Sequence, residues 1–155
     1  MHEIIWLWAL FLILNILDGF TTWLSIYKLP PELKGEEANP LFKDVEKQFF
    51  GSMVRKAVLV FLGLWVFLYL YNNNPIGGAF VFRVLNLVLL LAVLNNLYVY
   101  VSRRVKQRKT QTPVGLMHVL LNKLRVPKKV SRILAYYLVA GILVVASYFI
   151  TAVTI

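Results

Sequence analysis

The sequence predicts an all-α integral membrane protein with four transmembrane helices, and three observations lead to this prediction. Hydrophobic types make up 59% of the 155 residues and charged types only 15%, against roughly 45–50% and 25% in soluble domains. The mean hydropathy is +0.69. The apolar residues also gather in long runs, most of them near the roughly 20 residues that a spanning helix needs.

Four apolar runs define the expected spans, and each should be helical because a backbone in lipid must satisfy its own hydrogen bonds. The spans are residues 4–27, 54–72, 79–101 and 133–154. The second is the weakest, because Arg55 and Lys56 would have to extend toward the membrane surface. The first lacks the positive start and cleavage site of a signal peptide. We therefore expect one transmembrane domain over residues 1–155, without disulfides because cysteine is absent.

The basic residues predict the orientation of the chain. Of the 17 Lys and Arg residues, all except Arg83 lie either between the first apolar run and the uninterrupted apolar stretch that starts at Ala57, or between the third and fourth runs. The turn at residues 72–78 and the C-terminal tail carry no charge. Because basic residues favour cytoplasmic loops, we expect a multi-pass protein of the cell membrane with both long loops in the cytoplasm and both termini outside.

Each long loop is expected to contain an amphipathic helix lying on the membrane surface. The first covers residues 40–50 and begins at Asn39-Pro40, an N-cap followed by proline at the first helical position. The second covers residues 113–125 and begins in the same way at Thr112-Pro113. In both segments apolar residues recur at helical spacing, with polar or charged residues between them.

A polybasic segment follows the third span and is expected to contact anionic lipids at the cytoplasmic face. It contains Arg103, Arg104, Lys106, Arg108 and Lys109. The alternative is docking to an acidic partner or to RNA. Nucleic acid is the weaker choice, because few aromatic residues alternate with the basic ones as they do in single-strand binding grooves.

A carboxylate in the first span is the strongest indication of a functional site. Asn15, Asp18 and Thr22 fall on one face of the expected helix, and that face must point into the bundle. A charged side chain in hydrocarbon is costly and marks a functional site by default. Asn95 and Asn96 of the third span lie close to the same depth, so we expect them to be partners of this face.

Glu37 and Asn39 lie in a loop bounded by proline and glycine on the same side as Asp18. Folded back, this loop would add oxygen ligands for a hard cation such as Mg²⁺, Ca²⁺ or Na⁺, or two carboxylates could share a proton. The competing interpretation makes Asp18 interhelical glue, worth about 1 kcal/mol per hydrogen bond, and makes Glu37 and Asn39 a helix cap. No other cofactor is predicted, and neither His2 nor His118 is expected to bind a metal.

The motif Asn15-x-x-Asp18-x-x-x-Thr22, followed by Glu37-x-Asn39-Pro40, resembles the signature of a family of small prokaryotic membrane proteins described as a domain of unknown function. The resemblance covers roughly residues 12–70. It implies a multi-span helical protein, and it implies no known activity.

Three hypotheses for the function follow from these features. The first is binding or transport of a cation or proton by the polar cluster of Asn15, Asp18, Thr22, Glu37, Asn39, Asn95 and Asn96. The second is a non-catalytic membrane adaptor or assembly subunit, which would use the basic cytoplasmic surface to bind a protein partner or would pair with a second copy. A lipid-modifying enzyme ranks last, because too few polar residues converge for acid–base or metal chemistry.

Overall fold

The computed structural model describes residues 2–34, 48–107 and 112–153, and every regular element in this part of the chain is helical. The elements are α1 (His2–Tyr27), the short 3₁₀ helix η1 (Pro31–Leu33), α2 (Phe49–Asn73), α3 (Pro75–Lys106), α4 (Pro113–Lys123) and α5 (Lys128–Val153). The predicted all-α class is confirmed over these residues.

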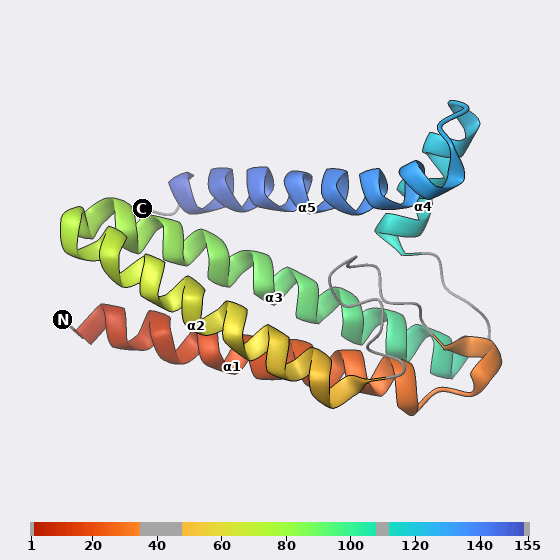
Figure 1. Cartoon of the computed structure of the whole chain (residues 1–155), viewed down its shortest axis with the longest axis horizontal. Helices are drawn as coiled ribbons and strands as arrows, with labels where there is room; N and C mark the ends of the chain where they lie inside the picture. The colour runs from red at the N-terminus through yellow and green to blue at the C-terminus, as the bar shows by residue number, and fades with distance from the viewer. Residues whose placement is uncertain (1, 35–47, 108–111, 154–155) are drawn as a thin grey trace.

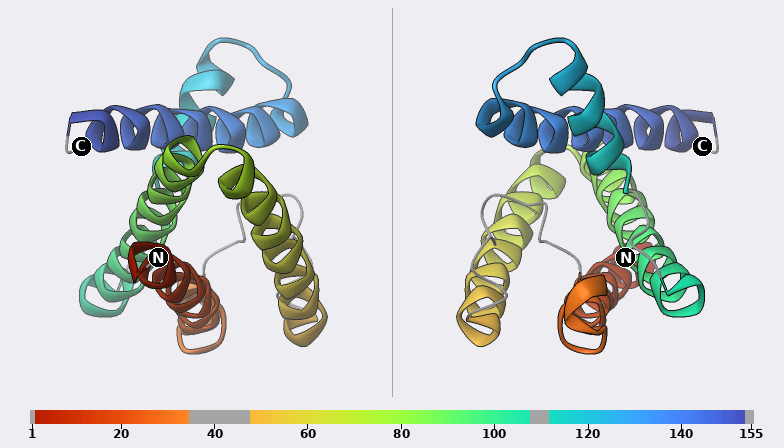
Figure 2. Two further views of the ribbon diagram at one scale, coloured as in Figure 1. Left: turned by 90° about the vertical axis from the view of Figure 1, so that its left-hand side faces the viewer. Right: turned by 90° about the vertical axis from the view of Figure 1, so that its right-hand side faces the viewer.

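Helix α3 lies at the centre of the arrangement and contacts α1, α2 and α5. Helix α1 packs along α3 most extensively, whereas α2 diverges from α1 (Figure 2). Helix α5 crosses α3 obliquely and carries α4 at its start (Figure 1). The beginning of α1, the α2–α3 turn and the end of α5 lie toward one end of the molecule (Figure 1).

Four helices are long and apolar enough to cross a membrane: Ile4–Tyr27, Phe49–Asn73, Pro75–Lys106 and Val130–Val153. Their outward faces carry large apolar side chains, such as Trp65, which is 69% exposed, and Ile142, which is 57% exposed. Contiguous apolar surface on this scale is rare on soluble monomers. The chain is therefore a polytopic helical membrane protein.

Two helices extend past the apolar runs that predicted them. Helix α2 begins at Phe49 and carries Arg55 and Lys56 inside it, and α3 continues to Lys106. Most of the expected surface helix at residues 40–50 lies outside the described residues, and its last two positions belong to α2. Helix α4 falls within the expected range of residues 113–125 and starts with the predicted Thr112 cap. Its position at a membrane surface stays a prediction.

An aromatic core joins the first three helices. The rings of Phe67 and Phe82 stack with their centroids 3.8 Å apart, and Phe11 lies 5.1 Å from Phe82. Leu64 completes this buried cluster. A second cluster, toward the other end of α1 and α3, contains Leu29, Leu33 and Tyr100. The two clusters hold α1 against α3 near both of its ends.

The turn between α2 and α3 is tight because its residues cap one helix and stop the other. The side-chain oxygen of Asn74 accepts a hydrogen bond from the Gly77 amide at 3.0 Å, and Pro75 occupies the first helical position. A Cβ atom on Gly78 would lie 2.7 Å from the Tyr71 Cα. Glycine therefore allows the backbones of α2 and α3 to meet directly at this end.

Candidate functional site

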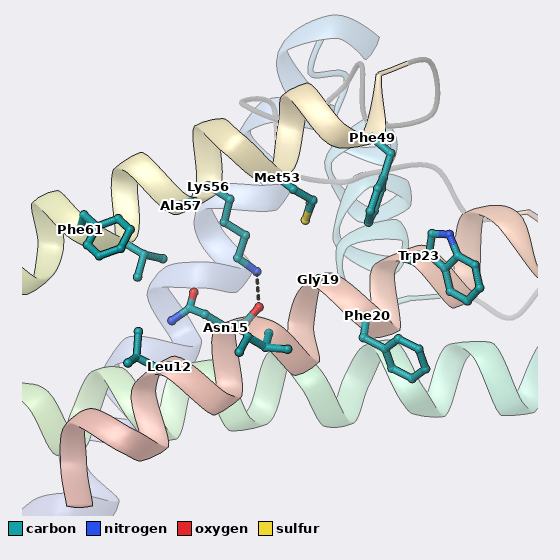
Figure 3. A pocket seen from close by; sticks show the side chains of 12 residues that line it. Leu12, Asn15, Gly19, Phe20, Trp23, Phe49, Met53, Lys56, Ala57 and Phe61 are labelled. Atoms are coloured by element: carbon teal, nitrogen blue, oxygen red, sulfur yellow. Dashed lines mark hydrogen bonds between the residues drawn. The ribbon is translucent and has the colours of Figure 1, made fainter. Parts of the chain in front are cut away.

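Asp18 of α1 binds polar groups from both α2 and α3. Its Oδ2 lies 2.5 Å from the Lys56 ammonium, and its Oδ1 accepts a hydrogen bond from the Asn96 amide at 3.0 Å. The Lys56 ammonium also donates to the backbone carbonyl of Asn15 at 3.2 Å (Figure 3). We call Asn15, Asp18, Lys56 and Asn96 the Asp18 cluster.

The lengths of the helices bring these groups to one level. Asp18, Lys56 and Asn96 lie nine, seven and ten residues from the ends of their helices at Tyr27, Phe49 and Lys106. At 1.5 Å per residue, all three sit about 10–15 Å inside the same end of the bundle. Three helices with unrelated sequences therefore meet through their charged and amide groups at this depth.

The cluster is electrically neutral and largely enclosed. The Lys56 side chain is 16% exposed and the Asp18 side chain 23%. In lipid each charge alone would be costly, but the pair offsets much of that cost because the ammonium and carboxylate charges cancel. Asn96 satisfies the second carboxylate oxygen, so the cluster links α1 to both neighbouring helices.

Other polar side chains near Asp18 bond to the backbone of α1. The Asn15 amide donates to the Phe11 carbonyl at 2.9 Å, and the Thr21 hydroxyl donates to the Asp18 carbonyl at 3.2 Å. These are local bonds within one helix. Asn15 therefore joins the cluster through its main-chain oxygen and not through its side chain. Thr22 is half-buried beside Thr21.

The structure brings together some of the predicted site residues. Asn96 binds Asp18, whereas Asn95 is half-buried next to it and does not supply that hydrogen bond. Glu37 and Asn39 lie outside the described residues, so their predicted approach to Asp18 stays a prediction.

Sequence reasoning missed Lys56 as the partner of Asp18. Lys56 was expected to extend to the membrane surface, but its ammonium points inward to the carboxylate. A depth count could have found the pair if the second span had been started at Phe49 instead of at residue 54. Antiparallel α1 and α2 would then place Asp18 and Lys56 at matching levels.

In the part of the chain that the structure describes, the groups around Asp18 suit an ammonium better than a divalent metal. Among the described residues, no group of three or more His, Cys, Asp and Glu side chains converges. Mg²⁺ and Ca²⁺ need six or more oxygen ligands. Both oxygens of Asp18 are already bound, one by a cation that belongs to the protein itself.

The predicted basic surface divides into buried and exposed residues. Arg103 is only 7% exposed, and its guanidinium donates to the Leu33 carbonyl at 3.2 Å. It therefore fastens the segment after α1 to α3. Arg104, which donates to the Tyr100 hydroxyl at 2.6 Å, and Lys106 are exposed. Arg108 and Lys109 lie outside the described residues.

A mostly apolar cavity of about 630 Å³ opens between α1 and α2 (Figure 3). We call it the α1–α2 groove. Lys56 and Asn15 are its polar lining residues. The other lining residues are Leu12, Ile16, Gly19, Phe20, Trp23, Phe49, Met53, Ala57, Val60 and Phe61. The Asp18 cluster thus borders a space whose walls are two membrane-spanning helices.

Residues 9–102 match a family described as Domain of unknown function (DUF5658). The match covers more than half of the 155 residues. The chain belongs to the DUF5658 family. This confirms the predicted resemblance to a family of unknown function, and the motif itself stays a prediction. The DUF5658 match contains the whole Asp18 cluster and the α1–α2 groove. No curated protein and no solved structure matches the chain.

Outside the DUF5658 match, α4 and α5 are joined by a closed ring of hydrogen bonds. The Ser131 hydroxyl lies 2.8 Å from Asn122 Oδ1 and 2.9 Å from His118 Nδ1, and the Asn122 amide lies 3.2 Å from His118 Nε2. A neutral His118 with its proton on Nδ1 satisfies all three contacts, a tautomer inferred from the network. Ser131 is fully buried, so the ring is a structural link between the two helices.

Replacing Ser131 with Ala should loosen α4 from α5. The change leaves polar atoms of His118 and Asn122 without a partner, at a cost of about 1–3 kcal/mol. Faster amide hydrogen exchange in α4 would show the loss. Ser147→Ala is the matched control, because the buried Ser147 hydroxyl has no hydrogen-bond partner among the described residues. Equal exchange in the two variants would contradict the role given to the ring.

Proposed function

We propose that this protein binds a proton or a small monovalent cation at Asp18, in exchange with the Lys56 ammonium. The Asp18–Lys56 contact of 2.5 Å inside a bundle of membrane-spanning helices supports this proposal. Ionisable residues inside membranes are rare, pair with one another and mark ion or proton pathways.

The charges around Asp18 explain how the exchange would work. The groups that bind its carboxylate are Lys56 from α2 and Asn96 from α3, and the Lys56 ammonium also binds the Asn15 carbonyl of α1. A proton on Asp18 would remove the negative charge that holds the ammonium. Lys56 would then be free to turn away, and α2 could shift because it has few contacts with α1.

A monovalent cation could replace the ammonium in the same place. The Asp18 carboxylate and the Asn15 carbonyl already bind the Lys56 ammonium, and both are oxygen ligands of the kind that hard cations prefer. A bound Na⁺ would therefore displace Lys56 and leave the net charge of the site unchanged.

The test is ion flux in vesicles that contain the purified full-length protein. With an imposed pH gradient, the wild type should dissipate the gradient several-fold faster than protein-free vesicles, whereas Asp18→Asn should fall to the protein-free rate. Separate Na⁺ and K⁺ gradients distinguish proton from cation exchange. Glu32→Gln, which changes an exposed carboxyl group outside the cluster, should behave like the wild type. Equal flux through wild type and Asp18→Asn would refute the proposal.

A membrane adaptor remains the second candidate because basic side chains are exposed at the same end of the molecule. Arg104 and Lys106 of α3 and Lys123 of α4 are exposed, and such residues attract anionic lipids or acidic partners. An adaptor predicts no protein-dependent flux and no effect of Asp18→Asn beyond stability. The flux experiment therefore separates the two functions.

A further inference from the structure

We propose that the α1–α2 groove binds a membrane-dissolved compound with a planar ring and a neutral carbonyl oxygen, of the quinone type, and that this oxygen accepts a hydrogen bond from Lys56. The proposal concerns a different ligand from the proton or cation at Asp18. It stands whether or not Asp18 exchanges ions.

The groove has the dimensions of a ligand site. The rings of Tyr27 and Phe49 meet at 5.7 Å near one end of α1 and α2, and those of Trp8 and Phe67 meet at 6.4 Å toward the other. Between these contacts the helices separate and leave the cavity of about 630 Å³. Small-molecule sites typically measure about 300–1,000 Å³.

Lys56 offers the groove an unused hydrogen-bond donor. An ammonium group has three N–H donors, and two of them bind Asp18 and the Asn15 carbonyl. No other acceptor among the described residues binds it. Lys56 lines the groove (Figure 3), and hydrocarbon offers no water to complete the third bond. A ligand oxygen in the groove would complete it.

The charge balance favours a neutral oxygen over an anion. Asp18 already cancels the charge of Lys56 at 2.5 Å. A carboxylate or phosphate beside the pair would leave an uncompensated negative charge in a low-dielectric site, which is costly. A ketone or quinone oxygen accepts the hydrogen bond without adding charge.

Depth and lining favour a ring compound over a phospholipid. Lys56 lies seven residues inside α2, about 10 Å from its start, and Asp18 already pairs with its charge, so the groove offers no free cation to a phosphate head group. The groove wall also contains aromatic side chains, among them Phe20 and Trp23, whose rings stack at 6.0 Å with an interplanar angle of 22°. Aromatic walls of this kind pack well against a planar ring.

Quenching of Trp23 fluorescence tests the proposal, because Trp23 lines the groove. Trp6, Trp8 and Trp65 are changed to Phe so that Trp23 alone reports, and circular dichroism checks the fold. Decylubiquinone is added to the full-length protein in detergent, with its concentration expressed as mole fraction in the micelles. We expect saturable quenching that Lys56→Met weakens at least tenfold. Decylbenzene, which has a ring and chain without a carbonyl, should restore the fluorescence only at a mole fraction at least tenfold above that of the bound decylubiquinone.

Two further variants keep the result interpretable. Asp18→Leu combined with Lys56→Met removes the donor and the charge together, so it should bind the quinone as weakly as Lys56→Met while keeping its helices. Lys106→Met changes an exposed lysine at the end of α3 and should bind like the parent. Three results would each overturn the proposal: quenching that does not saturate, equal binding by Lys56→Met and the parent, or recovery of the fluorescence by decylbenzene at the same mole fraction as decylubiquinone. Normal proton flux together with any of these results would remove the quinone site and leave the Asp18 site intact.

Discussion

Lys56→Met alone is expected to lower the free energy of unfolding by about 3–5 kcal/mol, because it leaves the enclosed carboxylate of Asp18 without its counter-charge. The ammonium lies 2.5 Å from Asp18 and also binds the Asn15 carbonyl, so one substitution removes two contacts between α1 and α2. In detergent the midpoint of thermal unfolding should fall by roughly 10 °C. Circular dichroism against temperature measures the change.

The double variant Asp18→Leu with Lys56→Met should recover most of the lost stability. Apolar side chains of similar volume often replace an enclosed ion pair at little cost, and these two would pack beside the apolar wall of the α1–α2 groove. Lys106→Met, an exposed change, should stay within about 0.5 kcal/mol of the wild type. If Lys56→Met and the wild type have the same midpoint of thermal unfolding, the ion pair does not stabilise the bundle. If the double variant is no better than the single one, the loss comes from packing and not from charge.

Gly78→Ala is expected to destabilise the α2–α3 hairpin by about 3 kcal/mol, since overpacked contacts typically cost 1–3 kcal/mol and more where they cannot relax. The new Cβ would lie 2.7 Å from the Tyr71 Cα and 2.9 Å from the Tyr71 nitrogen. Both are backbone atoms, so no flexible side chain can move aside. The two helices would have to separate at their turn, next to the stacked rings of Phe67 and Phe82. Thermal unfolding in detergent measures the effect.

Gly141→Ala is the matched control for Gly78→Ala. It makes the same chemical change in the middle of α5, where a Cβ would meet nothing within 4 Å. Alanine in a helix interior is more stable than glycine by about 0.5–1 kcal/mol, so this variant should melt slightly above the wild type. A Gly78→Ala protein that melts at the same temperature as Gly141→Ala would show that α2 and α3 can separate freely at the turn.

The sequence alone predicted the class of fold and one contact of the site. Apolar run length and the hydrogen-bonding needs of the backbone in lipid are local properties, so four apolar helices could be expected without a structure. The Thr112 cap of α4 is local in the same way. A polar face on the first span had to point inward, and counting residues along the helices placed Asn96 near Asp18, where it binds.

Only the tertiary structure decided which basic residue forms an ion pair with Asp18 and which basic residue is buried. Lys56 at the start of an apolar run and Arg103 in a polybasic segment both read as surface residues, because hydropathy treats each residue without regard to its neighbours in space. Whether a lysine turns outward or inward depends on how α2 is rotated and how closely it approaches α1. The ring contacts at the two ends of α1 and α2 set that approach. The contact of Gly78 with Tyr71 fixes the start of α3 against the end of α2.

The α1–α2 groove also depends on how α2 packs and could not be predicted from the sequence. Its lining residues look like ordinary lipid-facing positions in the sequence, since each is apolar and lies in a predicted span. They form a cavity because α1 packs along α3, whereas α2 diverges from α3 beyond the turn that joins them (Figure 2). Composition and periodicity determined that this protein lies in a membrane as four helices with a carboxylate inside. The packing of α2 decided that the carboxylate meets a lysine and that a cavity opens beside the pair, because helix spacing depends on contacts between residues far apart in the chain.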